Sequence, residues 1–433
     1  MIGARPHVVI IGAGFGGIGA AHALREADVD VTVVDANNYH LFQPLLYQVA
    51  IAGLDADDIA YPVRAILRRP ARRKRDTNSN VAFRLGRVTA IEPNDHRVTL
   101  ADGATLTYDQ LVLAAGAVTN TFGVPGADTN ALGMKTRRDA LAIRSALLRR
   151  FEQAAADLAA GRDVVNGSLR VAIVGGGPTG VELAGGLHEL IVRVLRRDFP
   201  TLPFDDAGIT LIEATDRVLG TFTPRLTTKA ARTLERMGVA VALGTGVTAI
   251  DPAAVVLADG RRIEAGTIIW AAGVKAGPLA AASGLPLGRS GRIVVDDHLQ
   301  VPGHPEIFVV GDVAATLDNL GDGGVLPQVA QVAIQGGRYA GRAIAATRAA
   351  GGNSQPDPFR YKDKGSMATI GRRAAVSQFP SGLSLSGSIG WAAWLGLHLV
   401  YLIGFRNRLN VLVNWTWNYL TYDHASRLID GDD

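Results

Sequence analysis

The chain has 433 residues, of which 51 are glycine and none is cysteine, and its 44 Lys and Arg outnumber its 40 Asp and Glu. Because cysteine is absent, disulfides, thiolate nucleophiles, thiolate metal sites and dithiol redox relays are all excluded. The length predicts roughly two to three domains, and glycines scattered through apolar segments without a three-residue period favour an α/β protein with many tight turns.

Residues 7–35 contain the first motif, a β-strand, a glycine turn, a helix and a second strand. Gly12, Gly14 and Gly17 have the G-x-G-x-x-G spacing: the first permits the turn, the second lets the backbone approach a pyrophosphate, and the third allows close helix packing. Asp35 ends the second strand, where its carboxylate can accept a hydrogen bond from a ribose hydroxyl. The segment therefore predicts a dinucleotide site and a core strand rather than a secretory signal.

A cluster of positive charge follows in residues 64–75. Nucleic acid, an anionic membrane and plain solvent are the three environments that suit such a run. The cluster consists of Arg64, Arg68, Arg69, Arg72, Arg73, Lys74 and Arg75.

The βαβ pattern recurs in residues 169–214. Gly175, Gly177 and Gly180 repeat the glycine spacing, and the second strand again ends in a carboxylate, Glu213. A carboxylate at this position bonds an unmodified ribose and repels a 2′-phosphate, so we expect NADH rather than NADPH.

The segments after each motif are also duplicated. Residues 81–108 predict short strands followed by an apolar strand that ends at Ala115 and Gly116, and residues 255–273 repeat this order up to Gly273. Residues 136–160 predict one long charged helix linking the halves. The predicted fold class is α/β, with two Rossmann-like dinucleotide-binding domains, one inserted in the other.

Polar groups follow the second unit. Asp312 leaves an apolar strand directly after Gly311, and Gln331 and Gln335 lie four residues apart on one face of an otherwise apolar predicted helix. We interpret the two amides as hydrogen-bonding groups turned toward a cleft.

The C-terminal segment has a different composition. Residues 374–405 contain no charged side chain other than histidine, and residues 409–422 combine aromatic residues with Asn410, Asn414 and Asn418 at every fourth position. An aromatic, arginine-flanked amphipathic helix is typical of a monotopic membrane anchor. A dimer interface and a single membrane span are the alternatives, although a span needs about 20 predominantly apolar residues.

Together with residues 40–50, 330–335 and 362–368, these motifs make the chain resemble the type II NADH:quinone oxidoreductases, over nearly its whole length. The resemblance implies non-covalent FAD bound by Gly12, Gly14, Phe15, Gly16, Asp35, Ala115, Gly116 and Asp312. It implies substrate NADH bound by Gly175, Gly177, Thr179, Gly180, Glu213 and Gly273. It further implies that Gln331 and Gln335 border the quinone headgroup, and that Glu182, near nicotinamide and flavin, forms a catalytic pair with Lys364 as its charge partner.

The resemblance also implies an organisation and a location. We expect an FAD-binding domain of residues 1–125 and 290–365, an NADH-binding domain of residues 126–289, and a membrane-anchoring region of residues 366–433. Expected partners are a membrane quinone, an anionic lipid surface at the cytoplasmic face of the cell membrane, and a second copy of the chain. Nucleic acid is not expected as a partner. No metal ion is expected, since the nine histidines are scattered.

The expected reaction has two steps: NADH transfers a hydride to FAD, and the reduced FAD then passes two electrons to a quinone. No proton pumping is expected. One alternative is a soluble NADH-dependent reductase of a small iron–sulfur protein that docks on the basic cluster. Another is a membrane-tethered NADH-binding protein in which the flavin is only a structural ligand.

Overall fold

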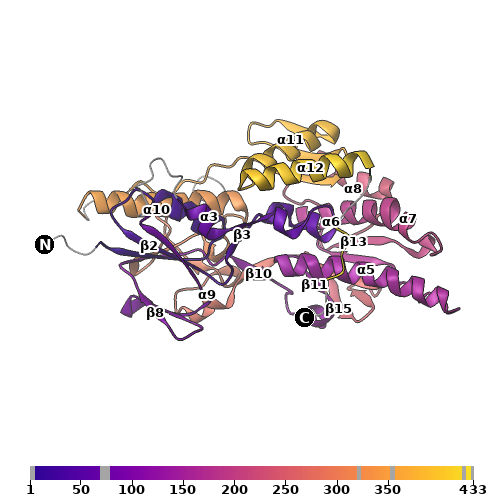
Figure 1. Ribbon diagram of the computed structural model, residues 1–433, viewed down its shortest axis with the longest axis horizontal. Coiled ribbons are helices and arrows are strands. Elements are labelled where there is room, and N and C mark those ends of the chain that lie inside the picture. The colour runs from indigo at the N-terminus through magenta and orange to yellow at the C-terminus, as the bar shows by residue number, and fades with distance from the viewer. Residues whose placement is uncertain (1–4, 69–78, 319–322, 352–355, 422–425, 431–433) are drawn as a thin grey trace. The chain divides into compact units, whose positions relative to one another are not determined.

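The computed structural model describes residues 5–68, 79–318, 323–351, 356–421 and 426–430, which belong to two compact units (Figure 1). The first unit contains Met1–Leu41, Tyr61–Val118 and Val274–Asp363. The second contains Phe42–Ala60, Thr119–Gly273 and Lys364–Asp433. The predicted α/β class with two Rossmann-like units is confirmed.

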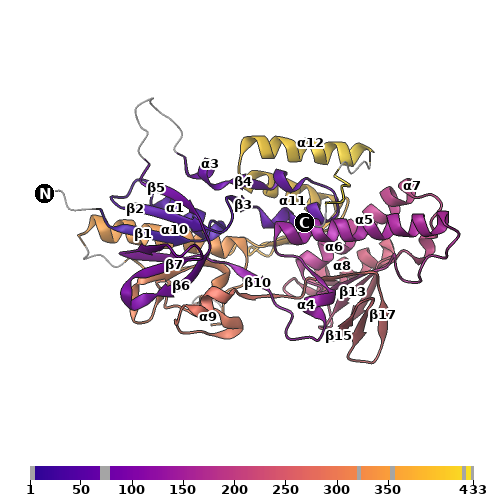
Figure 2. The same ribbon diagram turned by 60° about the horizontal axis from the view of Figure 1, so that its bottom comes forward.

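The first unit is built on a six-stranded sheet of order β21-β22-β9-β1-β2-β5, in which only the β21–β22 pair is antiparallel. Figure 2 labels three of its strands, β1, β2 and β5. Its strands are apolar and buried because a parallel sheet is covered on both faces. The strands are β1 (His7–Ile11), β2 (Asp30–Asp35), β5 (Val81–Leu85), β9 (Gln110–Leu113), β21 (Gln300–Val301) and β22 (His304–Val309). A smaller antiparallel sheet contains β6 (Val88–Glu92), β7 (Arg97–Leu100) and β8 (Thr105–Thr107).

Two helices of the first unit, α1 (Phe15–Ala23) and α10 (Ala330–Ala349), pack with their backbones almost in contact. A Cβ atom added to Gly337 would lie 1.9 Å from the carbonyl oxygen of Gly16, and one added to Gly341 would lie 2.6 Å from that of Ala20. Glycine is therefore required on the α10 side of this contact.

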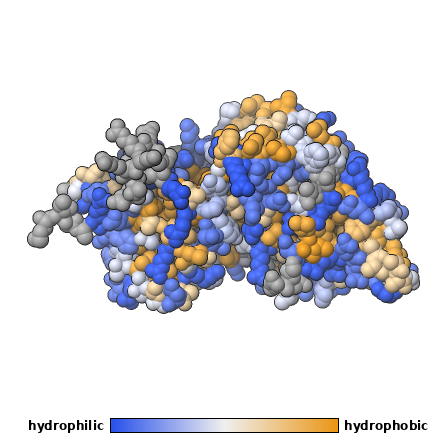
Figure 3. Space-filling view, viewed as in Figure 1, coloured by the Kyte–Doolittle hydropathy of each residue, from blue (hydrophilic) through white to orange (hydrophobic). Residues whose placement is uncertain are grey.

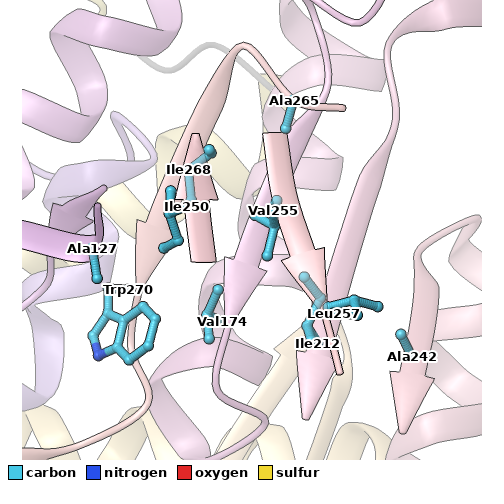
Figure 4. Packing of buried hydrophobic residues seen from close by; sticks show 11 residues of the cluster. Ala127, Val174, Ile212, Ala242, Ile250, Val255, Leu257, Ala265, Ile268 and Trp270 are labelled. Carbon is cyan, nitrogen blue, oxygen red and sulfur yellow. The ribbon is translucent and has the colours of Figure 1, made fainter. Parts of the chain in front are cut away.

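The second unit contains a five-stranded parallel sheet of order β11-β18-β12-β13-β14. A second layer, the antiparallel sheet β15-β16-β17, covers it, and the apolar side chains between the layers form a continuous core (Figure 4). The strands are β11 (Leu132–Gly133), β12 (Val171–Val174), β13 (Ile209–Glu213), β14 (Ala240–Leu243), β15 (Val247–Asp251), β16 (Ala254–Leu257), β17 (Arg262–Glu264) and β18 (Thr267–Trp270).

The long predicted helix is α5 (Arg137–Ala159), and it lies within the second unit instead of linking the two. Its start is fixed by a capping box, in which Asp139 N donates to Thr136 Oγ1 at 3.1 Å and Thr136 N donates to Asp139 Oδ2 at 2.8 Å. Its buried face packs against β11, β18 and the short helix α2 (Leu46–Ala50).

The other boundaries differ from the prediction at four places. Residues 119–125, expected in the first domain, belong to the second unit, and residues 274–289, expected in the second domain, belong to the first. Residues 42–60, expected in the first domain, belong to the second unit because α2 packs against α5 and α6 (Pro178–Glu189). Residues 364–433, expected as a separate region, belong to it as well. Their strands β24 (Ser366–Gly371), β25 (Ala374–Gln378) and β26 (Ser384–Ser386) form an antiparallel sheet whose edge packs on α6, and α11 (Gly387–Tyr401) and α12 (Phe405–Thr421) complete the layer.

Candidate functional site

The first glycine turn has no room for a side chain at two of its three glycines. Gly12 has a φ of +101°, and a Cβ atom there would lie 2.3 Å from the carbonyl oxygen of Ala114. At Gly17 a Cβ atom would lie 1.8 Å from the carbonyl oxygen of Gly12, whereas at Gly14 it would meet no atom within 4 Å. The turn therefore leaves free space on the side where a phosphate would approach.

Asp35 closes this turn from the neighbouring strand. Ala13 N donates to its Oδ2 at 2.7 Å, and Asn37 N donates to its Oδ1 at 2.7 Å. Beside it, the ring of Phe15 meets the ring of buried His40 edge-on at 4.9 Å. Asn37 Nδ2 also donates to Oδ1 at 3.4 Å, so Oδ2 is the oxygen with a further lone pair for a ligand hydroxyl.

Other predicted residues of the first unit lie at strand ends. Ala115 and Gly116 follow β9, and Gly116 has a φ of +71°. Asp312 follows β22 after Gly311, whose φ is +75°, and the Asp312 carbonyl accepts from Gln328 Nε2 at 2.9 Å. These positions belong to the carboxyl edge of the parallel sheet, where open α/β sheets bind their ligands.

The second glycine turn repeats the first. Gly175 has a φ of +111°, a Cβ atom at Gly180 would lie 1.8 Å from the Gly175 carbonyl oxygen, and one at Gly177 would meet nothing within 4 Å. Gly176 N donates to Glu213 Oε2 at 2.6 Å, and Thr215 N donates to Glu213 Oε1 at 2.8 Å. The same arrangement of turn and carboxylate thus exists once in each unit.

Two more predicted residues flank the second turn. Thr179 is half-buried in the first turn of α6. Gly273 follows β18, its carbonyl accepts from Asn120 N at 3.0 Å, and a Cβ atom there would lie 2.9 Å from the Phe122 ring. A side chain at position 273 would therefore displace that ring.

Glu182 is a buried carboxyl group on α6, 9% exposed. Its hydrogen bonds come from Thr369 N, which donates to Oε1 at 3.3 Å, and from Trp394. Burial raises the pKa of Glu182 to about 8, against an ordinary value of 4.5. Glu182 therefore carries a proton at neutral pH.

The predicted charge pair of Glu182 with Lys364 is not formed. Lys364 Nζ instead donates to the hydroxyl of Tyr401 at 3.2 Å and lies 5.7 Å from the centre of that ring. The physical reason is protonation: a neutral carboxyl group needs no cation, so its burial is compatible with hydrogen bonds alone.

A cavity of about 580 Å³ lies beside Glu182, within the second unit. Three tryptophans give it a mostly apolar wall, and the polar groups on it include Tyr47, Thr369 and a second acid of α6, Glu189. Tyr47 OH and Thr369 Oγ1 are hydrogen-bonded at 3.0 Å, and Gln48 Nε2 donates to Tyr47 OH at 2.6 Å. The tryptophans are Trp391, Trp394 and Trp415.

The two predicted glutamines have different surroundings in the first unit. Both side-chain ends of Gln335 are bonded to the backbone of Lys362, with Nε2 donating to its carbonyl at 2.9 Å and Oε1 accepting from its N–H at 3.0 Å. Gln331, in the first turn of α10, accepts from Tyr361 OH at 3.5 Å. Gln335 thus fixes the backbone of the loop at Lys362, whereas Gln331 lies beside the hydroxyl of Tyr361.

Helix α12 has its polar side inward. Asn407 is buried and donates to the Asp58 carbonyl at 2.9 Å, Asn414 donates to the Asp58 carboxylate at 2.8 Å, and Asn418 donates to the Gly53 carbonyl at 2.8 Å. The outward side is apolar, and Figure 3 shows hydrophobic surface over α11 and α12. The large exposed residues there are Ile389, Leu397, Val400, Phe405, Leu409, Leu412, Val413, Trp417 and Leu420.

The described part of the chain contains neither a membrane-spanning helix nor a metal-binding cluster. None of its helices is long and apolar enough to cross a bilayer. No three of its His, Asp and Glu side chains are grouped so that they would hold a metal ion. Of the basic cluster, Arg69, Arg72, Arg73, Lys74 and Arg75 lie outside the described residues, whereas Arg64 lies over the ring of Phe83.

The sequence analysis did not single out Glu189, Tyr47 or Asp58. Glu189 had a usable signal, since it lies seven residues after Glu182 on an otherwise apolar helix and so shares its face. Tyr47 belongs to the motif of residues 40–50, which assigned it no role, and Asp58 had no signal. Their contacts depend on the packing of residues 42–60 against the C-terminal segment.

Two Rossmann-like units, each with a glycine turn and a carboxylate, define a pyridine-nucleotide oxidoreductase that binds two dinucleotides. The model of the pyridine nucleotide-disulphide oxidoreductase family matches residues 6–337, and that of the NDH2 C-terminal domain matches residues 364–422. Without cysteine, the chain cannot use the disulphide chemistry in the name of the wider family.

Similar proteins narrow the family. The type II NADH:quinone oxidoreductases NdhA and Ndh of Mycobacterium tuberculosis are 44% and 40% identical to this chain, over 97% and 96% of its length and 88% and 89% of theirs. The structure of NDH2 from Plasmodium falciparum in complex with NADH has the same fold, with a TM-score of 0.88 at 21% identity, covering 99% of this chain and all of that one. The chain belongs to the type II NADH:quinone oxidoreductase family, and is a non-proton-pumping, FAD-dependent NADH dehydrogenase.

Proposed function

We propose that the first glycine turn holds FAD and the second holds NADH, so that the chain oxidises NADH and reduces a membrane quinone. The observation that carries this proposal is the duplicated turn, with Asp35 in one unit and Glu213 in the other. The first unit fits FAD because the space above Gly14 is free and Asp35 Oδ2 retains a lone pair for a ribose hydroxyl. When bound, FAD supplies hydride acceptance from NADH and electron transfer to the quinone.

NADH, rather than NADPH, is the nucleotide that the second unit favours. Both oxygens of Glu213 are already fixed by backbone donors, so the carboxylate keeps its position and its charge. A fixed negative charge accepts from a ribose hydroxyl and repels a 2′-phosphate.

Gln331 is our candidate for binding the quinone headgroup, to whose carbonyl its amide would donate. Gln335 would support it indirectly by fixing Lys362, and Lys364, paired with Tyr401, would act separately from Glu182. Glu182 is protonated at neutral pH and would serve as a proton-holding group near the reaction.

The outward faces of α11 and α12 are the proposed membrane contact, because exposed apolar and aromatic side chains gather there (Figure 3). The neighbouring Arg406 and Arg408 would strengthen binding to an anionic surface at the cytoplasmic face of the cell membrane. A homodimer through the same apolar faces is the second arrangement that would cover them.

The reductase of a small iron–sulfur protein is not favoured, because such a soluble enzyme has no use for a C-terminal domain with an apolar outer face. An interaction protein with an inert flavin is excluded by the family, whose members are oxidoreductases.

The test uses purified full-length protein with its visible spectrum. NADH should bleach the flavin absorbance and an added quinone should restore it. Gln331→Leu should leave the bleaching by NADH unchanged and slow the recovery by about tenfold or more, the loss of one hydrogen bond in the transition state. Gln335→Leu, which frees Lys362, is the comparison variant, and recovery at the wild-type rate in Gln331→Leu would refute the quinone role of Gln331.

A further inference from the structure

The cavity beside Glu182 contains a second carboxyl group that the proposed function does not use. Glu182 and Glu189 are the two carboxylic acids among the described residues that line it. They lie seven residues apart on α6, and with 1.5 Å of rise per residue their Cα atoms are about 10 Å apart. Two acids at this spacing on one face of a helix can be joined by a short file of water molecules in the cavity.

Gly186 lies between the two acids on the same face of α6 and also lines the cavity. A Cβ atom there would lie 2.5 Å from Cδ1 of Ile51, so even the smallest side chain would narrow the space between Glu182 and Glu189. The walls carry polar atoms along the way, from Tyr47 OH and Thr369 Oγ1. Water in the cavity would therefore have hydrogen-bonding partners between the two carboxyl groups.

Glu189 is the more exposed of the two acids. Its side chain is partly exposed, whereas Glu182 is buried. Arg372 N donates to Glu189 Oε1 at 2.5 Å, which fixes the carboxyl group without neutralising it. The charged groups near it are Arg372, from the turn between β24 and β25, and Arg193, from the π-helical turn after α6.

The proposed reaction needs a path along which a proton can enter from solvent. Quinone reduction to a quinol takes up two electrons and two protons, and NADH supplies two electrons but only one proton, as hydride. One further proton per turnover must come from water. Burial raises the pKa of Glu182 to about 8 and also raises the pKa of Glu189 from its ordinary value, so burial favours the protonated form of both groups.

We propose that the cavity is the route by which this proton enters the second unit, with Glu189 as the relay group that takes it from solvent and Glu182 as its destination. In each turnover the O–H bond of protonated Glu182 breaks first, its proton is consumed in the reduction of the quinone, and Glu182 is left as a carboxylate. The O–H bond of protonated Glu189 then breaks and its proton joins a cavity water. That water passes a proton on to the Glu182 carboxylate, and Glu189 is reprotonated from solvent. The proposal rests on the proposed function, since only quinone reduction consumes the proton.

Glu189→Gln in the full-length holoenzyme is the direct test. Glutamine keeps the oxygen that accepts from Arg372 N but cannot titrate, so the fold should be retained. We expect NADH to bleach the flavin at the wild-type rate, and recovery by a water-soluble quinone to be slowed by about tenfold at pH 7, increasingly so as the pH rises. Added imidazole, a small proton carrier, should restore part of the rate. Glu235→Gln, an exposed glutamate on α8 (Pro224–Met237), is the matched control.

A second variant and a second readout separate relay from structure. Gly186→Ala removes no titratable group but narrows the route, and should slow the same half-reaction. Infrared spectroscopy should show slower hydrogen–deuterium exchange of the Glu182 carboxyl group in both variants, with its band identified by its loss in Glu182→Gln.

Wild-type pH dependence of quinone reduction in Glu189→Gln would overturn the proposal. So would equal slowing of both half-reactions without rescue by imidazole, because that pattern indicates a structural role. Failure of the proposed function looks different: wild-type flavin would be bleached by NADH and not restored by quinone at all.

Discussion

The two glycine turns of the molecule are nearly the same object, yet the helices that follow them differ in one decisive position. In both turns the first glycine has a φ above +100°, the third lies against the carbonyl of the first, and the second faces free space. In both, a carboxylate at the end of the next strand accepts from the backbone of the turn. The helices differ two residues after the third glycine, where Gly19 in the first unit corresponds to Glu182 in the second.

Packing explains this difference. A Cβ atom at Gly19 would lie 3.1 Å from the carbonyl oxygen of Ile334, because α1 packs closely against α10. Helix α6 packs against β24 instead, and there the Thr369 N–H is available to a side chain at position 182. The turn thus provides nucleotide binding in both units, whereas the partner of the helix decides which of them carries a buried acid.

The largest expected effect is on the turns themselves. Gly180→Ala should lower the free energy of unfolding by about 1–3 kcal/mol, since its Cβ atom would clash with the Gly175 carbonyl, and should weaken NADH binding. Gly177→Ala should weaken NADH binding about as much without the loss of stability, because its Cβ atom meets no protein atom. Chemical denaturation and NADH titration of the two variants measure both effects. Equal stability losses in the two would contradict the picture of a self-supporting turn.

The carboxylates test whether the two turns serve different nucleotides. Glu213→Gln should weaken NADH binding by about tenfold and reduce the preference for NADH over NADPH, because the repulsion of a 2′-phosphate is lost. The glutamine oxygen can still accept from Gly176 N, so the turn should remain. Asp35→Asn is the counterpart, and should lower FAD content while leaving the nucleotide preference unchanged. The ratio of kcat/KM for NADH and NADPH decides, and an unchanged ratio in Glu213→Gln would refute the assignment.

The buried acid should make stability depend on pH. The folded state keeps the Glu182 proton up to about pH 8, whereas the unfolded chain loses it near the ordinary pKa of 4.5. Its contribution is therefore complete below the ordinary pKa and is lost as the pH rises toward the raised one. The glutamine of Glu182→Gln is neutral at every pH. The free energy of unfolding, measured by urea denaturation, should therefore fall less steeply between pH 5 and pH 8 in the variant than in the wild type. Parallel pH profiles would show that Glu182 is ionised in the folded protein.

Sequence reasoning was strongest where backbone geometry depends on residue type. Both turns and both carboxylates followed from the glycine spacing and the apolar runs around it, because few other structures use that pattern. Asp58 lies outside any motif, and the motif of residues 40–50 assigned no role to Tyr47. The roles of both come from contacts with residues more than 300 positions away. The ion pair of Glu182 with Lys364 was wrong because sequence cannot show that burial keeps a carboxyl group neutral.

The sequence also could not predict that the polar face of α12 is turned inward. Asparagines at every fourth position indicate one polar side, and a surface helix normally turns that side to solvent. Here the backbone carbonyls of residues 53–60 have to be satisfied, and the asparagine amides satisfy them, so the apolar side is left outside. An amphipathic helix with this orientation is suited to a membrane surface and not to bulk water.

The smallest expected effect on stability distinguishes the two faces of α12. Val413→Ser and Trp417→Ser together change exposed side chains, so the free energy of unfolding should stay within about 0.5 kcal/mol of the wild type. Binding to vesicles that contain anionic lipid should nevertheless fall, since each lost apolar side chain removes roughly 1–2 kcal/mol of membrane affinity. Asn414→Ala should do the reverse, costing about 1 kcal/mol of stability through its lost hydrogen bond to Asp58 while leaving vesicle binding intact. Co-sedimentation with vesicles and chemical denaturation measure the two quantities, and equal vesicle binding by the double variant and the wild type would place the membrane contact on another surface.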